Sequence, residues 1–231
     1  MSNPTKETDQ VPACVGIIMD GNRRWAKEHG LPKLEGHRRG YDLAIECARW
    51  VRDCGIKHLV LYAFSTENWN REEDEVSYLM GLLRDMTVNG LKELTKENVR
   101  IRFIGTRDRL SSDILKVMEL VEKESAGNSF TMWVCLSYGG RAEITAAAAA
   151  AAAAGVSITE DSLHSYFWSS SMPDPDLIIR TSGEKRLSNF LLWQAAYSEL
   201  FFTDTKWPDF SKEEFDSILA EFAQRERRRG K

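Results

Sequence analysis

Charged and polar side chains follow an apolar run near the start of the chain. Residues 15–19 (VGIIM) lead into Asp20, Gly21 and Asn22, and two arginines and a tryptophan come next. An apolar run of this length that ends at a turn is typical of a buried strand. Ligands bind beyond the carboxyl ends of strands in open α/β sheets. One carboxylate beside two guanidinium groups suits a site for a metal ion and an anionic group, although a solvated surface turn would have the same composition.

Three further polar clusters follow apolar runs. They are STENWNR (65–71), YGGR (138–141) and RTSGEKR (180–186). Helices between parallel strands place the carboxyl ends of the strands at one edge, so we expect the four clusters to lie together. Guanidinium groups bind phosphate oxygens in pairs, and the arginines gathered here outnumber those that one phosphate needs: Arg23, Arg24, Arg71, Arg180 and Arg186. A pair of diphosphates or a nucleotide would fit, but neither GxxxxGK[ST] nor GxGxxG occurs.

Strand and helix patterns alternate along the chain and position these clusters. Apolar runs predict six strands: 15–19, 58–64, 100–105, 130–137, 177–179 and 200–202. Helical spacing of apolar residues predicts helices over 36–54, 72–97 and 112–125, and a final helix with Ser211 and Glu214 as a capping box. A run of nine alanines, 146–154, also favours a helix. We therefore expect one α/β domain with a mainly parallel sheet of about six strands, flanked by helices.

Composition limits the classes of protein that remain. A chain of 231 residues with 42% hydrophobic residues suits one domain. Its net charge of −4 argues against general nucleic-acid binding. The four cysteines have no CxxC spacing, so a reducing, cytoplasmic compartment is expected. Residues 1–12 are polar and are predicted to be a disordered lead-in to a domain over 13–231, and no apolar run is long enough to span a membrane.

Five segments together carry a resemblance to a known family. They are MDGNRRWA (19–26), GHRRG (36–40), YAFSTENWNR (62–71), IRTSGEKRLSNFLLWQ (179–194) and YSELFF (197–202). In this order they resemble the cis-prenyltransferases, whose typical bacterial member is undecaprenyl diphosphate synthase. The match runs from about residue 15 to the C-terminus and is weakest between 141 and 180.

The resemblance implies an enzyme that joins an allylic diphosphate, such as farnesyl diphosphate, to isopentenyl diphosphate. Asp20 would be the catalytic acid linked to Mg²⁺, Glu199 a second metal ligand and Asn68 the proton acceptor. The allylic diphosphate would be bound by Gly21, Asn22, Arg23, Arg24, Trp25, Lys33 and His37. A second substrate-binding loop would contribute Ser65, Thr66, Glu67, Trp69 and Arg71. Isopentenyl diphosphate would be held by Arg180, Arg186, Leu187 and Ser188.

The resemblance also implies a homodimer, an apolar tunnel beneath the site and a polyprenyl product, such as undecaprenyl diphosphate, handed to the membrane for cell-wall synthesis. The protein would act in the cytoplasm or at the inner face of the membrane. Two departures from the usual pattern are Lys33, in place of arginine, and Ser137, in place of asparagine. Phe130, with Leu83 and Met86, would shorten the product. A short-chain synthase, a non-catalytic partner subunit of the same fold and a phosphohydrolase remain as alternatives.

Overall fold

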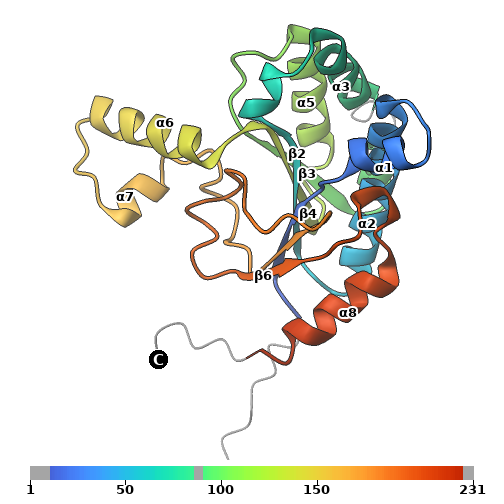
Figure 1. The fold of residues 1–231 in the computed structure, drawn as a ribbon. Coiled ribbons are helices and arrows are strands. Elements are labelled where there is room, and N and C mark those ends of the chain that lie inside the picture. Colours follow the sequence, from blue (N-terminus) through green and yellow to red (C-terminus); the bar gives the residue numbers. More distant parts are fainter. Residues whose placement is uncertain (1–10, 86–90, 226–231) are drawn as a thin grey trace, which may run out of the picture.

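The computed structural model describes residues 11–85 and 91–225, and its centre is a six-stranded sheet (Figure 1). The strands lie in the order β3-β4-β2-β1-β5-β6, and every neighbouring pair is parallel. Their bounds are β1 Cys14–Ile18, β2 His58–Ser65, β3 Val99–Ile104, β4 Phe130–Tyr138, β5 Leu177–Arg180 and β6 Glu199–Phe202. The prediction of one α/β domain with six strands is confirmed.

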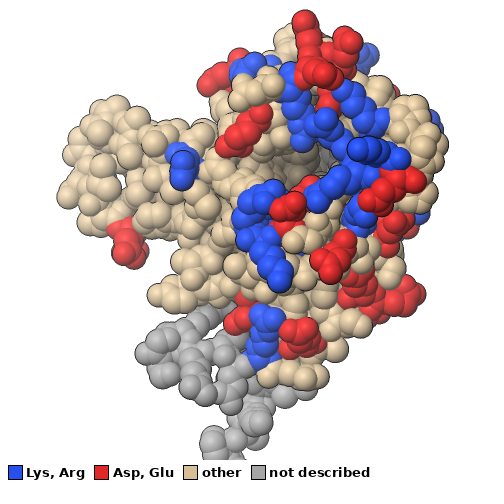
Figure 2. Space-filling view, viewed as in Figure 1, with Lys and Arg blue, Asp and Glu red and all other residues tan. Residues whose placement is uncertain are grey.

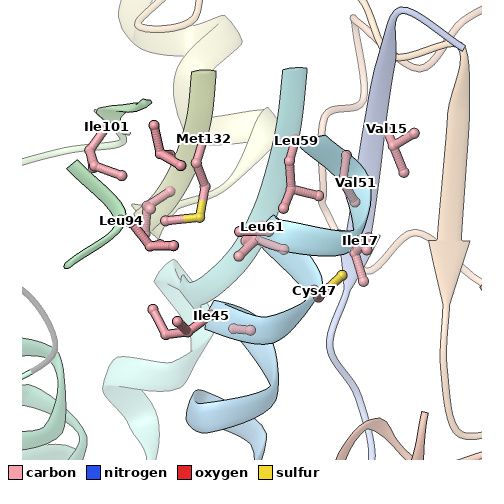
Figure 3. Close-up of a cluster of buried hydrophobic side chains, with 14 of the residues drawn as sticks. Val15, Ile17, Ile45, Cys47, Val51, Leu59, Leu61, Leu94, Ile101 and Met132 are labelled. Atoms are coloured by element: carbon pink, nitrogen blue, oxygen red, sulfur yellow. The ribbon is translucent and has the colours of Figure 1, made fainter. Parts of the chain in front are cut away.

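Side chains alternate between two apolar layers along each central strand. In β1, Val15 and Ile17 belong to the larger core cluster (Figure 3), whereas Cys14 and Ile18 belong to a second cluster on the opposite face. All nine residues of β4 are buried. A parallel sheet covered on both faces has this pattern, because the helices that connect its strands pack over it.

Helices cover the face with the larger cluster. They are α1 Asn22–Glu28, α2 Lys33–Asp53, α3 Glu73–Asp85, α4 Leu91–Lys96, α5 Ser112–Glu124 and α8 Lys212–Phe222. A short 3-10 helix, η1 Thr66–Asn70, follows β2, and η3 Trp207–Asp209 precedes α8. The helix predicted over 72–97 is described on both sides of residues 86–90, as α3 and α4. Residues 86–90, Met86 among them, lie outside the described part of the chain.

The opposite face is covered mainly by irregular segments between residues 165 and 198. Phe190 and Leu191 are fully buried against this face, and Gly16 in β1 leaves room for the Phe190 ring, which a Cβ at that position would approach to 3.1 Å. Two helices, α6 Gly140–Ala153 and α7 Glu160–His164, project from the body of the molecule as an arm (Figure 1). The alanine run therefore forms a helix, as predicted.

Small residues allow α1 to lie directly against α2. A Cβ on Gly36 would lie 2.0 Å from the carbonyl oxygen of Asn22, and a Cβ on Gly40 would lie 2.1 Å from the Asn22 side-chain oxygen. Both glycines are buried in α2. The close contact fixes the helix that carries the DGNRR arginines.

Within the described ranges, none of the helices has the length and apolar character needed to cross a membrane. Residues 1–10, most of the predicted lead-in, lie outside the description.

Candidate active site

The site lies where the strand order reverses. From β1 the chain moves to β2, β3 and β4 on one side, and β5 and β6 then pair on the other side of β1. Crevices for ligands form beyond the carboxyl ends of the strands at such a switch point. Ile18 and Arg180 are register partners at the ends of β1 and β5, so the residues that follow these strands meet in this crevice.

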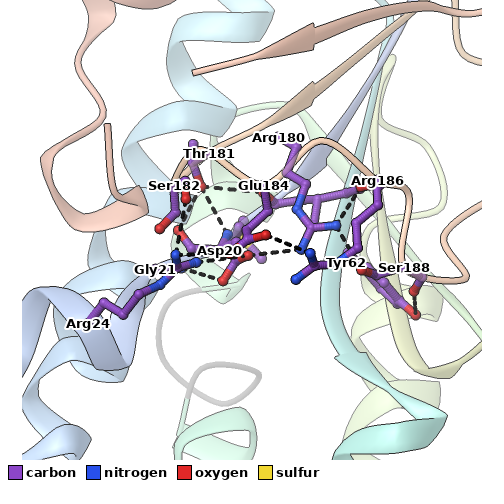
Figure 4. A network of polar contacts seen from close by, with 12 residues as sticks. Asp20, Gly21, Arg24, Tyr62, Arg180, Thr181, Ser182, Glu184, Arg186 and Ser188 are labelled. Atoms are coloured by element: carbon purple, nitrogen blue, oxygen red, sulfur yellow. Dashed lines mark hydrogen bonds and ion pairs between the residues drawn. The ribbon is translucent and has the colours of Figure 1, made fainter. Parts of the chain in front are cut away.

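Asp20 is held at the centre of the crevice by hydrogen bonds and ion pairs (Figure 4). One carboxylate oxygen accepts a hydrogen bond from the Gly21 amide at 2.7 Å, and the other lies 2.9 Å from Arg180 Nη2 and 3.2 Å from Arg24 Nη2. The Asp20 amide donates to Thr181 at 2.9 Å. Gly21 has a φ of 104°, and a Cβ there would lie 2.7 Å from Ser182 Oγ. Glycine therefore permits the turn that aims Asp20 at the arginines.

Arg180 is a buried cation, 4% exposed, at the end of β5. Besides Asp20 it donates to Ser188 Oγ at 2.7 Å and to the Arg186 carbonyl oxygen. The loop that supplies these acceptors contains four non-glycine residues with positive φ: Ser182, Ser188, Asn189 and Leu191. Unfavourable backbone geometry of this kind is concentrated at functional sites.

A cationic pocket of about 580 Å³ opens on one side of Asp20. Figure 2 shows lysine and arginine side chains gathered around a hollow in this face. Its walls include the first turn of α1, which follows the DG sequence, and the first two turns of α2. The lining residues are Met19, Asp20, Gly21, Asn22, Arg23, Arg24, Lys27, Lys33, His37 and Arg71.

A second polar pocket, of about 450 Å³, shares Asp20, His37 and Arg71 with the first. Its other walls come from the carboxyl end of β2, from η1 and from the 180–188 loop. They include Ser65, Glu67, Asn68, Arg180, Arg186 and Ser188. The Asn68 side-chain oxygen accepts a hydrogen bond from the Ser65 backbone amide at 3.0 Å. This bond fixes the Asn68 side chain against the end of β2.

An apolar hollow adjoins both polar pockets. It is lined by Tyr41 and Ala44 of α2, Phe64 of β2 and Leu79 and Leu83 of α3. Its volume is about 90 Å³. A long prenyl chain needs more room than this, so the tunnel stays a prediction. Phe130 lies outside this wall, at the start of β4, and is buried in the larger core cluster.

Several residues implied by the resemblance do not line these pockets. Trp25 donates from its indole nitrogen to Asp209 at 2.7 Å and stacks on His29. Trp69 donates to Ser137 at 2.8 Å and packs against Phe64 and the Arg109 guanidinium. Thr66 and Leu187 are likewise absent from the described residues that line the two polar pockets.

Glu199 lies far from Asp20 within this chain. It begins β6 in register with Leu177, whereas Arg180, three residues later in β5, contacts Asp20. Three residues of strand span about 10 Å. Glu199 instead pairs with Arg225 at 2.8 Å. The acid that lies near Asp20 is Glu184, which the sequence analysis did not single out and which contacts Arg24 at 3.3 Å and Arg186 at 2.5 Å.

Both departures from the usual motif have structural partners. The Lys33 ammonium lies 2.5 Å from Glu72 and 3.2 Å from Glu75, and its hydrogen bonds with these two acids raise its pKa. Ser137 has a φ of 50°, a conformation in which asparagine is favoured over most residues. Its hydroxyl accepts the hydrogen bond from Trp69.

An aspartate held by arginines, at the switch point of a parallel sheet, defines a class of α/β protein that is suited to phosphorylated ligands. Comparisons with known proteins specify the class. The family model for undecaprenyl diphosphate synthase matches residues 18–230. The isoprenyl transferase of Agrobacterium fabrum is 50% identical over 235 residues, covering 98% of this chain and 95% of that protein.

Two solved structures share the fold, each at 33% identity. Lavandulyl diphosphate synthase from Lavandula x intermedia, in complex with dimethylallyl diphosphate, has a TM-score of 0.92 and covers 96% of this chain and 100% of its own. A protein from Campylobacter jejuni described as a probable undecaprenyl diphosphate synthase has a TM-score of 0.81, with coverage of 95% and 99%. The chain belongs to the undecaprenyl diphosphate synthase family of cis-prenyltransferases and is therefore a transferase.

Proposed function

We propose that this transferase adds isopentenyl diphosphate in cis to an allylic diphosphate and so extends a polyprenyl diphosphate. The observation that carries the proposal is the junction of two arginine-lined pockets and one apolar hollow at Met19, Asn22 and His37. Two diphosphates require two cationic pockets, and a growing hydrocarbon requires an apolar one beside them.

The first pocket suits the allylic diphosphate. Its arginines and lysines can neutralise the leaving group, and the apolar hollow begins at the same residues, Met19 and His37. The second pocket suits isopentenyl diphosphate, whose oxygens Arg180, Arg186 and Ser188 would bind. Substrates bound in this way would have their reacting carbons near each other, and holding two reactants together supplies a large part of an enzymatic rate enhancement.

The chemistry expected of these residues is electrostatic. The carbon–oxygen bond of the allylic diphosphate breaks as its carbon joins the double bond of isopentenyl diphosphate, and negative charge grows on the leaving diphosphate. Guanidinium groups fixed before the reaction stabilise that charge. The isopentenyl unit must then lose a proton from the carbon next to its cationic centre, which forms the new double bond. Asn68 lies in the second pocket but is a weak base as a neutral amide, so a diphosphate oxygen or Ser65 would assist it.

Members of this family use a divalent metal, and we propose that Mg²⁺ binds at Asp20. In the described ranges no three acidic, histidine or cysteine side chains converge on a metal site. Mg²⁺ is commonly held by one or two carboxylates together with substrate phosphates and water, so Asp20 beside the first pocket fits this demand. When bound, the ion would neutralise diphosphate charge. Glu199 is too far from Asp20 of the same chain to bind this ion together with it.

Two product classes remain as proposals. A long product such as undecaprenyl diphosphate, starting from farnesyl diphosphate, agrees with the bacterial relatives. A short product is the second candidate, because the apolar hollow is only about 90 Å³ and a lavandulyl diphosphate synthase has the same fold over 96% of the chain.

We also propose a homodimer that hands its product to the membrane. An interface is supported by three exposed apolar residues. They are Val156 and Ile158, between α6 and α7, and Tyr197, just before β6. Residues 226–231, whose motif resembles a family tail that reaches the partner's site, lie outside the described chain. Sedimentation at twice the 26.3 kDa chain mass is expected.

The release of diphosphate tests the proposed reaction against its alternatives. Wild-type protein should release diphosphate only when both substrates are present, and Asp20→Ala should lose at least about 100-fold of this rate. Release from one substrate alone would favour a phosphohydrolase. No release from either combination would favour a non-catalytic subunit of the same fold.

A further inference from the structure

Glu75, in the first turn of α3, is a buried carboxylate that the motifs do not single out. Its side chain is 1% exposed. Acidic side chains are almost never fully buried unless they are paired, because loss of water around the charge is costly. The neighbours that compensate this cost are all basic, and they come from three other segments of the chain.

The distances define a cluster of four bases around one carboxylate. Arg71, which caps η1, lies 2.9 Å from Glu75 Oε1, and Lys33, at the start of α2, lies 3.2 Å from Oε2. The His37 ring nitrogen is 3.4 Å from Oε1, and Arg23 Nε of α1 is 3.9 Å away. Glu75 therefore ties α1, α2, η1 and α3 to one point.

These four bases are also walls of the cationic pocket, whereas Glu75 is absent from the described residues that line either polar pocket. The carboxylate therefore contacts the bases from behind and leaves the ligand side open. Burial alone would raise the pKa of Glu75, but the Lys33 hydrogen bond and the charges of Arg71 and Arg23 hold it below its usual value. The group is an anion at neutral pH.

We propose that Glu75 is a positioning residue that aims Arg23, Lys33 and Arg71 at the diphosphate of the allylic substrate. The proposal rests on the proposed function for the identity of that ligand. The three cations are partly exposed and repel one another, so without a fixed counter-charge their long side chains would turn toward water. An arginine or lysine side chain loses rotamer entropy when it is fixed in one orientation. Because Glu75 orders them beforehand, the substrate binds without that cost.

Glu75→Gln tests the proposal, because glutamine keeps the volume and removes the charge. The matched control is Asp74→Asn, which makes the same change at an exposed position in the same helical turn. We expect Glu75→Gln to weaken the binding of inorganic diphosphate, measured by calorimetry, by about tenfold. The KM for the allylic diphosphate should rise by a similar factor, with kcat changed less than about threefold. Asp74→Asn should leave both within about twofold of wild type.

The His37 pKa gives a readout that general loss of stability would not produce. Glu75 acts to raise this pKa against burial and Arg71, which lower it. An NMR titration should therefore show the His37 pKa of Glu75→Gln below that of wild type and of Asp74→Asn.

Unchanged or tighter diphosphate binding by folded Glu75→Gln would overturn the proposal, since Glu75 would then be a bystander or a competitor. If Glu75→Gln does not unfold cooperatively, Glu75→Asp replaces it. That variant retracts the carboxylate by one methylene and should lose about threefold in affinity, and wild-type affinity would overturn the proposal. Diphosphate binding needs no turnover, so wild-type protein that binds diphosphate but elongates nothing would reject the proposed function while the Glu75 comparison still stands.

Discussion

Asp20 and Arg180 illustrate what single residues contribute to this site. Strand register pairs Arg180 with Ile18, two residues before Asp20, and a 2.9 Å contact joins the Arg180 and Asp20 side chains. Arg180 is almost fully buried and also holds the 186–188 segment through Ser188 and the Arg186 carbonyl oxygen. The pair therefore joins the first pocket to the second.

His37 is the residue whose titration we expect to see in the stability of the protein. Burial, together with Arg71, lowers its pKa below the usual 6.5. As the pH falls below 6.5, the unfolded chain therefore takes up a proton before the folded chain does. The stabilisation is complete above pH 6.5 and is lost as the pH falls through the folded pKa.

Replacing His37 by glutamine should remove this part of the acid sensitivity. We expect the free energy of unfolding, measured by urea titration at a series of pH values, to fall less steeply below pH 6.5 in His37→Gln than in wild type. His58, whose pKa burial also lowers, is present in both proteins and cancels in the difference. A difference between the two curves that does not vary with pH would contradict this assignment.

At the scale of elements, the contact between α1 and α2 positions the first pocket. Gly36→Ala would place a Cβ 2.0 Å from the backbone oxygen of Asn22, so α1 and its arginines would have to move. We expect the free energy of unfolding to fall by about 1–3 kcal/mol and the affinity for diphosphate to fall with it.

Gly81→Ala is the matched control for that substitution. Gly81 lies inside α3, and a Cβ there meets nothing within 4 Å. The same change should therefore raise the free energy of unfolding by about 0.5–1 kcal/mol, since alanine favours a helix. Equal effects of the two substitutions in chemical denaturation would show that α1 does not depend on the close contact.

The elements themselves could be predicted well from the sequence. The six apolar runs correspond to the six strands. β1, β4 and β5 are buried along their whole length, which leaves little but apolar residues in them. The alanine run gave α6 for reasons of intrinsic propensity. Helical periodicity over 72–97 likewise predicted the helical residues of α3 and α4.

The site could be predicted only in part. Motifs placed Asp20 beside Arg24 and Arg180, because Asp20 and Arg24 follow β1 and Arg180 ends the neighbouring strand β5. They gave no sign of Glu75, whose four partners come from α1, α2 and η1 and meet it only in the folded chain. Strand register, which a motif does not contain, separates Glu199 from Asp20. Glu184 instead shares Arg24 with Asp20 as an ion-pair partner.

At the scale of the whole molecule, two cationic pockets at the sheet edge open onto one apolar hollow between α2, α3 and β2. The residues that line this hollow come from all three elements, so its size is set by their packing together and not by any one residue.

The central claim is that this cleft joins two isoprenoid diphosphates by a carbon–carbon bond. The direct measurement is to incubate the protein with Mg²⁺, farnesyl diphosphate and radiolabelled isopentenyl diphosphate and to separate the products by reversed-phase chromatography. We predict labelled prenyl diphosphates longer than the primer, in amounts that depend on both substrates. Label that remains in isopentenyl diphosphate, while the primer is unchanged or merely hydrolysed, would contradict the account.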